Sequence, residues 1–205
     1  KPMCTNLPDG LEVLRKSKKH EGLVWIGLEY RFMSPIQSLI NHIEKIGDIR
    51  MLSIREHRFP FLKKVGNWNR FNENTGGTLV EKCCHFFDLM NLIVPSKPIK
   101  VYASGGQDVN HLDEKYDGKT PDIIDNSFVI IDYQDGQRAM LDLCMFAEAG
   151  KYEQEIVLTG DQGKLETYIP SNKLLLTNRK NYSLKTIEVK DDPRVKEAGF
   201  HHGAS

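Results

Sequence analysis

The most chemically suggestive part of the sequence is a helical segment that follows two adjacent glycines at positions 76 and 77. At about 100° per residue, Glu81, His85 and Asp88 fall on one face of this helix. The apolar side chains fall on the opposite face: Leu79, Cys83, Phe86, Phe87 and Met90. A carboxylate and an imidazole one turn apart can share a proton and can take the proton of a bound hydroxyl group. The paired glycines also predict backbone N–H groups that are open to an anion.

This spacing supports three interpretations. In the first, Glu81 and His85 form an i,i+4 pair on a solvated helix face. In the second, they carry out acid–base chemistry on a substrate. In the third, they bind a metal ion, but no Cys or second His stands at a recognisable ligand spacing, so we expect no metal.

Composition excludes several classes of function. The chain has 205 residues, and its 28 Lys and Arg balance its 28 Asp and Glu to a formal net charge of zero. A neutral chain lacks the basic surface that nucleic-acid binding requires, so no nucleic-acid partner is expected. No uninterrupted apolar run approaches the roughly 18 residues of a membrane span, so no membrane partner is expected. Four cysteines are too few for a disulfide scaffold and favour a reducing, cytoplasmic location.

The N-terminal segment predicts a helix followed by a buried strand. Asn6 is a good N-cap, Leu11 and Leu14 continue at helical spacing, and Gly22 marks the end of the helix. The apolar run at 23–28 is typical of a buried strand. Such a helix–strand unit is the kind that closes an α/β layer.

The rest of the chain predicts two helices and then a β-rich half. The helices are expected over about 35–46 and 78–93, with a strand at about 48–58 and a long loop between them. Apolar runs separated by turn signals predict further strands at 99–103, 127–133, 138–146, 155–159, 164–169, 173–177 and 184–189. Consecutive hairpins after the helices indicate an α+β fold, a large and mostly antiparallel open sheet with helices on one face.

Four short motifs occur in an order that resembles the Gfo/Idh/MocA family of oxidoreductases. They are Lys1-Pro2, Tyr30-Arg31-Phe32-x-x-Pro35, Trp68-x-Arg70 and Gly76-Gly77-x-Leu79-x-Glu81-x-x-x-His85-x-x-Asp88. The resemblance implies that residues 1–32 are the last helix and strand of a truncated Rossmann-type domain that binds a dinucleotide. It implies that residues 33–205 form a substrate-binding and oligomerisation domain, truncated at its C-terminus.

The resemblance also implies hydride transfer between NAD or NADP and a secondary alcohol of a sugar or polyol. Lys1 resembles the lysine of the family's Glu-Lys-Pro motif, and His85 resembles its catalytic histidine. Glu81 stands where many members carry Asp, which keeps the carboxylate but lengthens its arm. The resemblance makes these three the expected catalytic residues. It places Lys1, Trp68 and Arg70 at the cofactor, and Glu81, His85 and Arg31 at the substrate.

The Gly-x-Gly-x-x-Gly fingerprint of a dinucleotide site does not occur in the sequence, and the resemblance places it upstream of Lys1. We therefore expect the substrate-binding half of an enzyme, inactive as an isolated chain, that acts on a small molecule and forms a homo-oligomer through its open sheet. The alternative is a non-catalytic binding or assembly protein that keeps the sheet without the cofactor domain. A metal-dependent enzyme built on Glu81 and His85 is the third hypothesis.

Overall fold

The centre of the molecule is an eight-stranded sheet with the strand order β2-β3-β4-β1-β5-β6-β7-β8. A computed structural model of the chain describes residues 1–191 and residue 193. The strands are β1 Ile49–His57, β2 Pro98–Gly106, β3 Asn126–Tyr133, β4 Arg138–Cys144, β5 Gln154–Gly160, β6 Gly163–Ile169, β7 Lys173–Asn178 and β8 Ser183–Glu188. All neighbouring pairs are antiparallel except β1 and β4, which are parallel. The open, mostly antiparallel sheet of the predicted α+β fold is confirmed.

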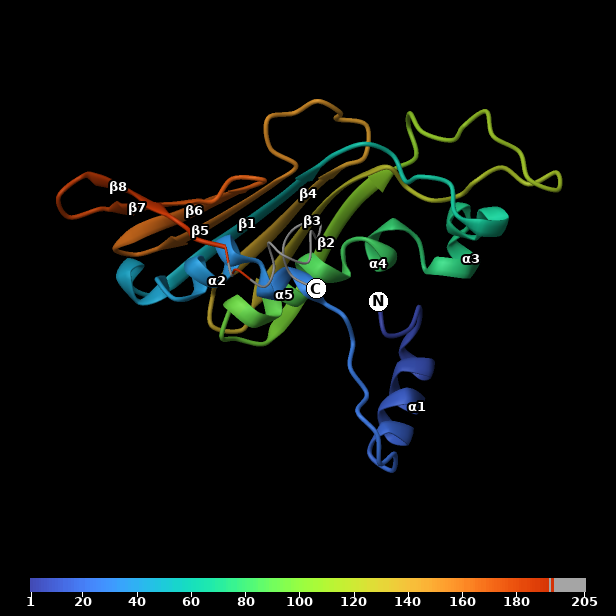
Figure 1. Ribbon diagram of the computed structural model, residues 1–205, viewed down its shortest axis with the longest axis horizontal. Coiled ribbons are helices and arrows are strands. Elements are labelled where there is room, and N and C mark those ends of the chain that lie inside the picture. The colour runs from blue at the N-terminus through green and yellow to red at the C-terminus, as the bar shows by residue number, and fades with distance from the viewer. Residues whose placement is uncertain (192, 194–205) are drawn as a thin grey trace.

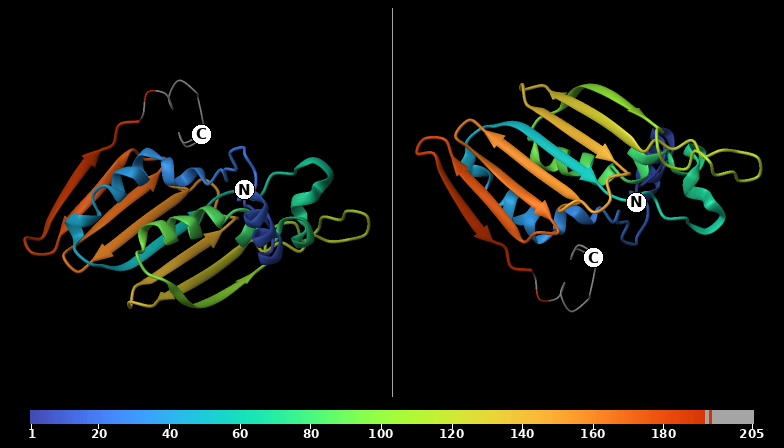
Figure 2. Two further views of the ribbon diagram at one scale, coloured as in Figure 1. Left: turned by 90° about the horizontal axis from the view of Figure 1, so that it is seen from below. Right: turned by 90° about the horizontal axis from the view of Figure 1, so that it is seen from above.

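Helices α2, Ser34–Ile40, and α5, Cys84–Ile93, lie against one face of this sheet, as the two opposite views of Figure 2 show. Alternate side chains of each strand point to opposite faces. In β3, Val129 and Ile131 are buried, whereas Phe128 and Ile130 are exposed. Helix α5, Cys84–Ile93, contributes Phe86, Leu89, Met90 and Ile93 to the same core. The core therefore sits between the helices and the sheet, and the other sheet face is open.

Both helices predicted between the strands are interrupted. The first is α2, Ser34–Ile40, followed by the 3₁₀ segment η2, Ile43–Ile46. The second is divided into α4, Thr78–Glu81, and α5. Lys82 follows α4, and its side chain is buried. A continuous amphipathic helix is thus replaced by two helices with a buried lysine between them.

The N-terminal segment confirms one predicted element and contradicts another. Helix α1 spans Leu7–Ser17, and its N-cap Asn6 accepts a hydrogen bond from Asp9 N at 2.9 Å. The strand predicted at 23–28 is wrong, because this segment pairs with no described strand and Leu23 is 93% exposed. A buried strand needs neighbours that satisfy its backbone groups and cover its side chains. In Figure 1, α1 stands away from the sheet and this segment connects the two.

Two remaining expectations concern the C-terminal limit of the domain and a membrane-spanning helix. The C-terminal limit of the predicted 33–205 domain and its truncation fall at 192 and 194–205, outside the described residues. Within the part of the chain that the structure describes, no helix is long and apolar enough to cross a membrane.

Candidate functional site

The predicted Glu–His–Asp face is buried, and its three side chains have three different sets of partners. Glu81 is 5% exposed and His85 is 2% exposed, so the solvated-face interpretation is wrong. The Glu81 carboxylate accepts a hydrogen bond from Lys64 Nζ at 2.5 Å. The Asp88 carboxylate binds the guanidinium of Arg31 through both of its oxygens. The helical spacing predicted one shared face, but in the folded chain each of the three side chains contacts a different residue.

Lys1 lies directly beside this segment. Its Nζ donates a hydrogen bond to the backbone oxygen of Glu81 at 2.8 Å, and Cys84 Sγ donates to the same oxygen at 3.6 Å. Burial lowers the pKa of the Lys1 ammonium below its ordinary value, and the charge of Lys82 lowers it further. A lysine with a lowered pKa exchanges its proton more readily near neutral pH. The structure thus brings Lys1 to the turn that joins Glu81 to His85.

His85 lies against a short 3₁₀ segment, η1, which spans Glu29–Phe32. The ring of Tyr30 stacks on the imidazole, with 4.3 Å between ring centroids and 10° between planes. Glu29 Oε1 lies 3.9 Å from His85 Nε2, so this carboxylate faces the imidazole. Arg31 was predicted as a site residue from the sequence, whereas Glu29 was not. The only feature of the sequence that pointed to Glu29 was its position two residues before Arg31.

A buried ionic cluster lies on the sheet side of the same turn. Lys82 Nζ lies 2.9 Å from Glu56 Oε1 and donates a hydrogen bond to the Tyr30 hydroxyl at 3.0 Å. Gln154 Nε2 donates to Glu56 Oε2 at 2.6 Å. Burial alone would lower the pKa of Lys82, but Glu56 and Tyr30 outweigh it and raise the pKa, so the ammonium is charged. The sequence signal was Glu56, which continues the buried register of Leu52 and Ile54 in β1.

Trp68 and Arg70, both predicted at the cofactor, have different surroundings in the 3₁₀ segment η3, Val65–Arg70. Trp68 is 41% exposed, and Lys64 Nζ lies 4.9 Å from the centroid of its ring, so Trp68 connects to Glu81 through Lys64. Arg70 is 4% exposed. Its guanidinium donates to Glu114 Oε2 at 2.8 Å and to the backbone oxygen of Phe61 at 3.0 Å. The geometry therefore favours Trp68 over Arg70 as a ligand contact.

The open N–H groups predicted at the two glycines are not available. Gly76 N donates to the backbone oxygen of Asn72 at 2.8 Å, and Gly77 N donates to Thr75 Oγ1 at 3.0 Å. Gly76 and Gly77 have φ of 73° and 81°, and a Cβ on Gly77 would lie 2.1 Å from Asn72 Oδ1. These glycines form the sharp turn between α3, Asn72–Thr75, and α4, and the predicted anion site is wrong.

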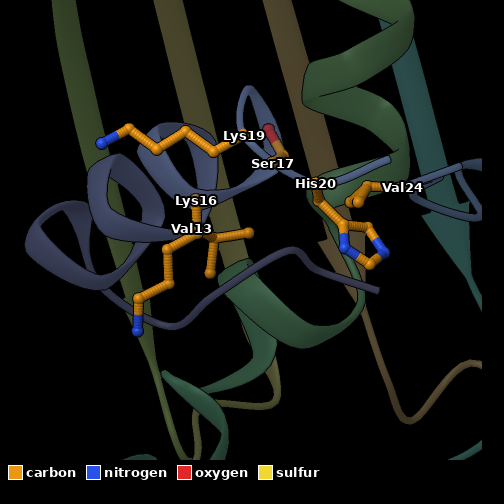
Figure 3. Close-up of a pocket in the computed structure, with 6 residues that line it drawn as sticks. All are labelled: Val13, Lys16, Ser17, Lys19, His20 and Val24. Carbon is orange, nitrogen blue, oxygen red and sulfur yellow. The ribbon is translucent and has the colours of Figure 1, made fainter. Parts of the chain in front are cut away.

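The described residues offer little support for a metal site. A separate feature is a hollow that lies apart from the candidate site. No three His, Cys, Asp or Glu side chains among the described residues gather closely enough to hold a metal ion. A shallow hollow lies between the end of α1 and residue 24. Figure 3 shows His20 beside Val24 in this hollow, with Lys16 and Lys19 extended away from them. None of the predicted site residues lines it.

Residues 40–202 match the family described as "Oxidoreductase family, C-terminal alpha/beta domain". The chain is 27% identical over 169 residues to myo-inositol 2-dehydrogenase of Thermotoga maritima, an alignment that covers 80% of this chain and 47% of that protein. It is 33% identical over 113 residues to YteT of Bacillus subtilis, which is named as an oxidoreductase, and this alignment covers 51% of this chain and 26% of YteT. The chain thus spans less than half the length of these curated relatives.

Solved structures share the fold at low sequence identity. Levoglucosan dehydrogenase in complex with NADH superposes with a TM-score of 0.78 and 14% identity, over 92% of this chain and 53% of that one. An NAD-binding oxidoreductase from Klebsiella pneumoniae superposes with a TM-score of 0.77 and 14% identity, over 98% of this chain and 56% of that one. These likenesses confirm the fold predicted from the sequence.

Proposed function

Because the chain belongs to the oxidoreductase family of the Gfo/Idh/MocA type, we propose that it carries the substrate-binding half of a nicotinamide-dependent dehydrogenase. The reaction is hydride transfer between NAD or NADP and a secondary alcohol of a sugar or polyol. Two relatives, named for myo-inositol and levoglucosan, support this substrate class. The observation that carries the proposal is Lys1, whose partly buried ammonium has a lowered pKa and donates a hydrogen bond to the turn between Glu81 and His85.

The donor set fits the reactive end of a nicotinamide cofactor but not its pyrophosphate. The glycine N–H groups at 76 and 77 are already bonded within the turn, and the sequence has no Gly-x-Gly-x-x-Gly. Lys1 and the half-exposed ring of Trp68 are the residues that would flank the nicotinamide. When bound, the nicotinamide supplies or accepts the hydride.

The site residues have distinct roles in the reaction. His85 takes this proton as general base, and Glu29, 3.9 Å from its Nε2, stabilises the imidazolium that forms. Lys1 polarises the reacting oxygen. Glu81 binds a second substrate hydroxyl through Oε2, the carboxylate oxygen outside its ion pair with Lys64.

We also propose the predicted division of the chain into residues 1–32, part of a dinucleotide-binding domain, and residues 33–205, the substrate-binding domain. The support is the apolar surface of the first segment, where Leu11, Leu23 and Trp25 are all exposed. Exposed apolar residues grouped in this way favour a covering partner. The isolated chain is therefore expected to be inactive.

The open face of the sheet is proposed as the surface for self-association. Phe128 and Ile130 of β3 are exposed on it, and Tyr102 of β2, the register partner of Ile130, is exposed beside them. Light scattering on the full-length protein tests this proposal. Ile130→Glu should reduce the molar mass to that of a smaller species, whereas Tyr182→Glu in the hairpin between β7 and β8 should not. An unchanged mass for Ile130→Glu would contradict it.

The enzymatic proposal is tested with the full-length protein, NAD⁺ or NADP⁺, and a panel of hexoses, inositols and anhydrosugars. Turnover of at least one alcohol is expected, with a loss of roughly 100-fold or more in kcat for His85→Gln. His42→Gln is the matched control, because His42 lies at the end of α2 and bonds the backbone oxygen of Ser38. Binding of a sugar without turnover under any condition would favour the non-catalytic binding protein.

A further inference from the structure

We infer that Tyr30 is a positioning residue for His85, and that the buried Glu56–Lys82 ion pair holds Tyr30 in place. The inference rests on the proposed role of His85 as general base. It assigns a function to the buried charged groups beneath the site, which the proposed chemistry does not use.

The stacked geometry restricts the imidazole of His85. Its plane lies within 10° of the Tyr30 ring plane, and the centroids are 4.3 Å apart. Phe86, the next residue of α5, meets the same tyrosine ring edge-on at 5.5 Å. Tyr30 thus packs against two consecutive residues of α5, and a rotation of the imidazole out of its plane would collide with the tyrosine ring. An imidazole held in one plane presents its nitrogen to the substrate in one direction.

The hydroxyl of Tyr30 is held by the buried ammonium of Lys82, which is itself held by an ion pair. Lys82 Nζ donates to this hydroxyl at 3.0 Å and lies 2.9 Å from Glu56 Oε1. Glu56 is fully buried, and Gln154, its register neighbour on β5, donates to its other oxygen at 2.6 Å. The buried ammonium of Lys82 must stay close to the carboxylate of Glu56. Its hydrogen bond therefore holds the Tyr30 hydroxyl in one favourable position. Burial also raises the pKa of Tyr30, so its phenol stays neutral.

The cluster explains the interruption of the predicted helix. Lys82 and Cys83 lie between α4 and α5, and this break accompanies the burial of Lys82 against β1. A buried ion pair adds little stability compared with apolar residues of similar size. What this pair adds is a fixed connection from the centre of the sheet, through Tyr30, to His85.

Substitutions of Tyr30 in the full-length enzyme separate positioning from general stability. Tyr30→Leu removes the stacked ring and should lower kcat by roughly 100-fold, with KM changed less than threefold. Tyr30→Phe keeps the ring but loses its anchor at Lys82, so it should recover part of the lost kcat and remain below wild type. The matched controls are Tyr133→Leu and Tyr133→Phe, since Tyr133 is equally buried in β3 and is not among the site residues. A Tyr30→Leu enzyme with kcat within twofold of wild type would overturn the inference.

Substitutions of the ion pair test the second part. Lys82→Met leaves the buried Glu56 with a single cation, Arg58, whose Nη1 lies 3.4 Å from Oε1, and should lower Tm by roughly 10 °C. Adding Glu56→Gln removes the buried negative charge that has lost Lys82, so most of this Tm loss should be recovered. The inference predicts that kcat is not recovered with Tm, because Tyr30 still lacks its anchor. Recovery of kcat together with Tm would show that the pair is only structural.

A spectroscopic measurement keeps this inference distinct from the proposed function. The Tyr30 ring should shift the imidazole proton resonances of His85 upfield, and Tyr30→Leu should remove this shift while Tyr30→Phe keeps it. His85→Gln assigns the resonances and, in the same enzyme assay, tests whether His85 matters for turnover. A ring shift as expected with full activity in His85→Gln would reject the proposed function but not the stacking. No upfield shift in the wild-type protein would reject the positioning role itself.

Discussion

Arg31 and Asp88 form a two-point ion pair that fastens η1 to helix α5. Arg31 was expected to contact the substrate, but its guanidinium binds a carboxylate one turn beyond His85. The pair holds the neighbouring residues Glu29 and Tyr30 against the imidazole. In this structure Arg31 therefore supports the site by holding η1 against α5, and it does not point to the substrate through a free guanidinium.

Loss of the Arg31–Asp88 pair should affect both stability and turnover. The side chains are 35% and 14% exposed, so Arg31→Met leaves a mostly buried carboxylate and should destabilise the protein by about 1–3 kcal/mol. Asp88→Asn should have a similar but smaller effect. Thermal unfolding and steady-state kinetics check this, with Arg50→Met as control because its ion pair with Asp48 is exposed. Equal losses in the two arginine variants would contradict the assignment.

Lys64 should matter through the carboxylate of Glu81. Without the ammonium at 2.5 Å, this carboxylate is free to change its direction, so Lys64→Met should raise the KM for the alcohol by roughly tenfold. The fold should remain intact, since Lys64 is half exposed. Lys63→Met is the matched control, because Lys63 lies over the ring of Tyr116 instead. An unchanged KM in Lys64→Met would remove Glu81 from the proposed substrate contacts.

Arg70 should behave as a structural residue. Removing its buried guanidinium leaves the backbone oxygen of Phe61 without this donor and the carboxylate of Glu114 without its cation. Arg70→Met should therefore destabilise the protein by about 2–4 kcal/mol. The KM for the nicotinamide cofactor should stay within threefold of wild type once the protein is folded. A large increase in that KM at unchanged stability would restore the cofactor role expected from the sequence.

The carboxylate of Glu114 gives the loop before β3 a defined pH dependence. Burial alone would raise its pKa, but hydrogen bonds from Arg70, His111 and Tyr116 outweigh this and lower the pKa to about 2. Because the pKa in the folded state is depressed, the stabilisation is present above the ordinary pKa of 4.5 and is lost as pH falls toward about 2. The Tm difference between wild type and Glu114→Gln should be constant above about pH 5 and should narrow at about pH 3. A constant difference down to that pH would contradict the assignment.

The parts of the fold that depend on local pattern could be predicted from the sequence. Alternation along β3 and β4 around the turn at residues 134–137 predicted the hairpin that the structure contains. Helix α1 was predicted from its N-cap and leucine spacing. These features depend on neighbours in sequence, so the pattern is sufficient for them.

The parts that depend on distant residues could not be predicted. Strand β1 pairs in parallel with β4 and antiparallel with β5, and nothing local to 49–57 specifies either partner. The Glu56–Lys82 pair was missed because a buried charge is stable only beside its partner, and the two residues come together only when β1 packs against the turn before α5. The apolar run at 23–28 fits a strand, but strand formation requires a partner that no described residue provides. The site could be located from its motif, whereas its contacts could not.

Isotope transfer is the most direct measurement of the hydride transfer that we propose at the site formed by Lys1, Glu81 and His85. The full-length protein is incubated with oxidised nicotinamide cofactor and an alcohol substrate deuterated at the reacting carbon. We expect deuterium to appear on the nicotinamide ring in the wild-type protein and in His42→Gln, and transfer to be reduced at least roughly 100-fold in His85→Gln. Undiminished transfer in His85→Gln, or no transfer by the wild-type protein with any alcohol of the panel, would contradict it.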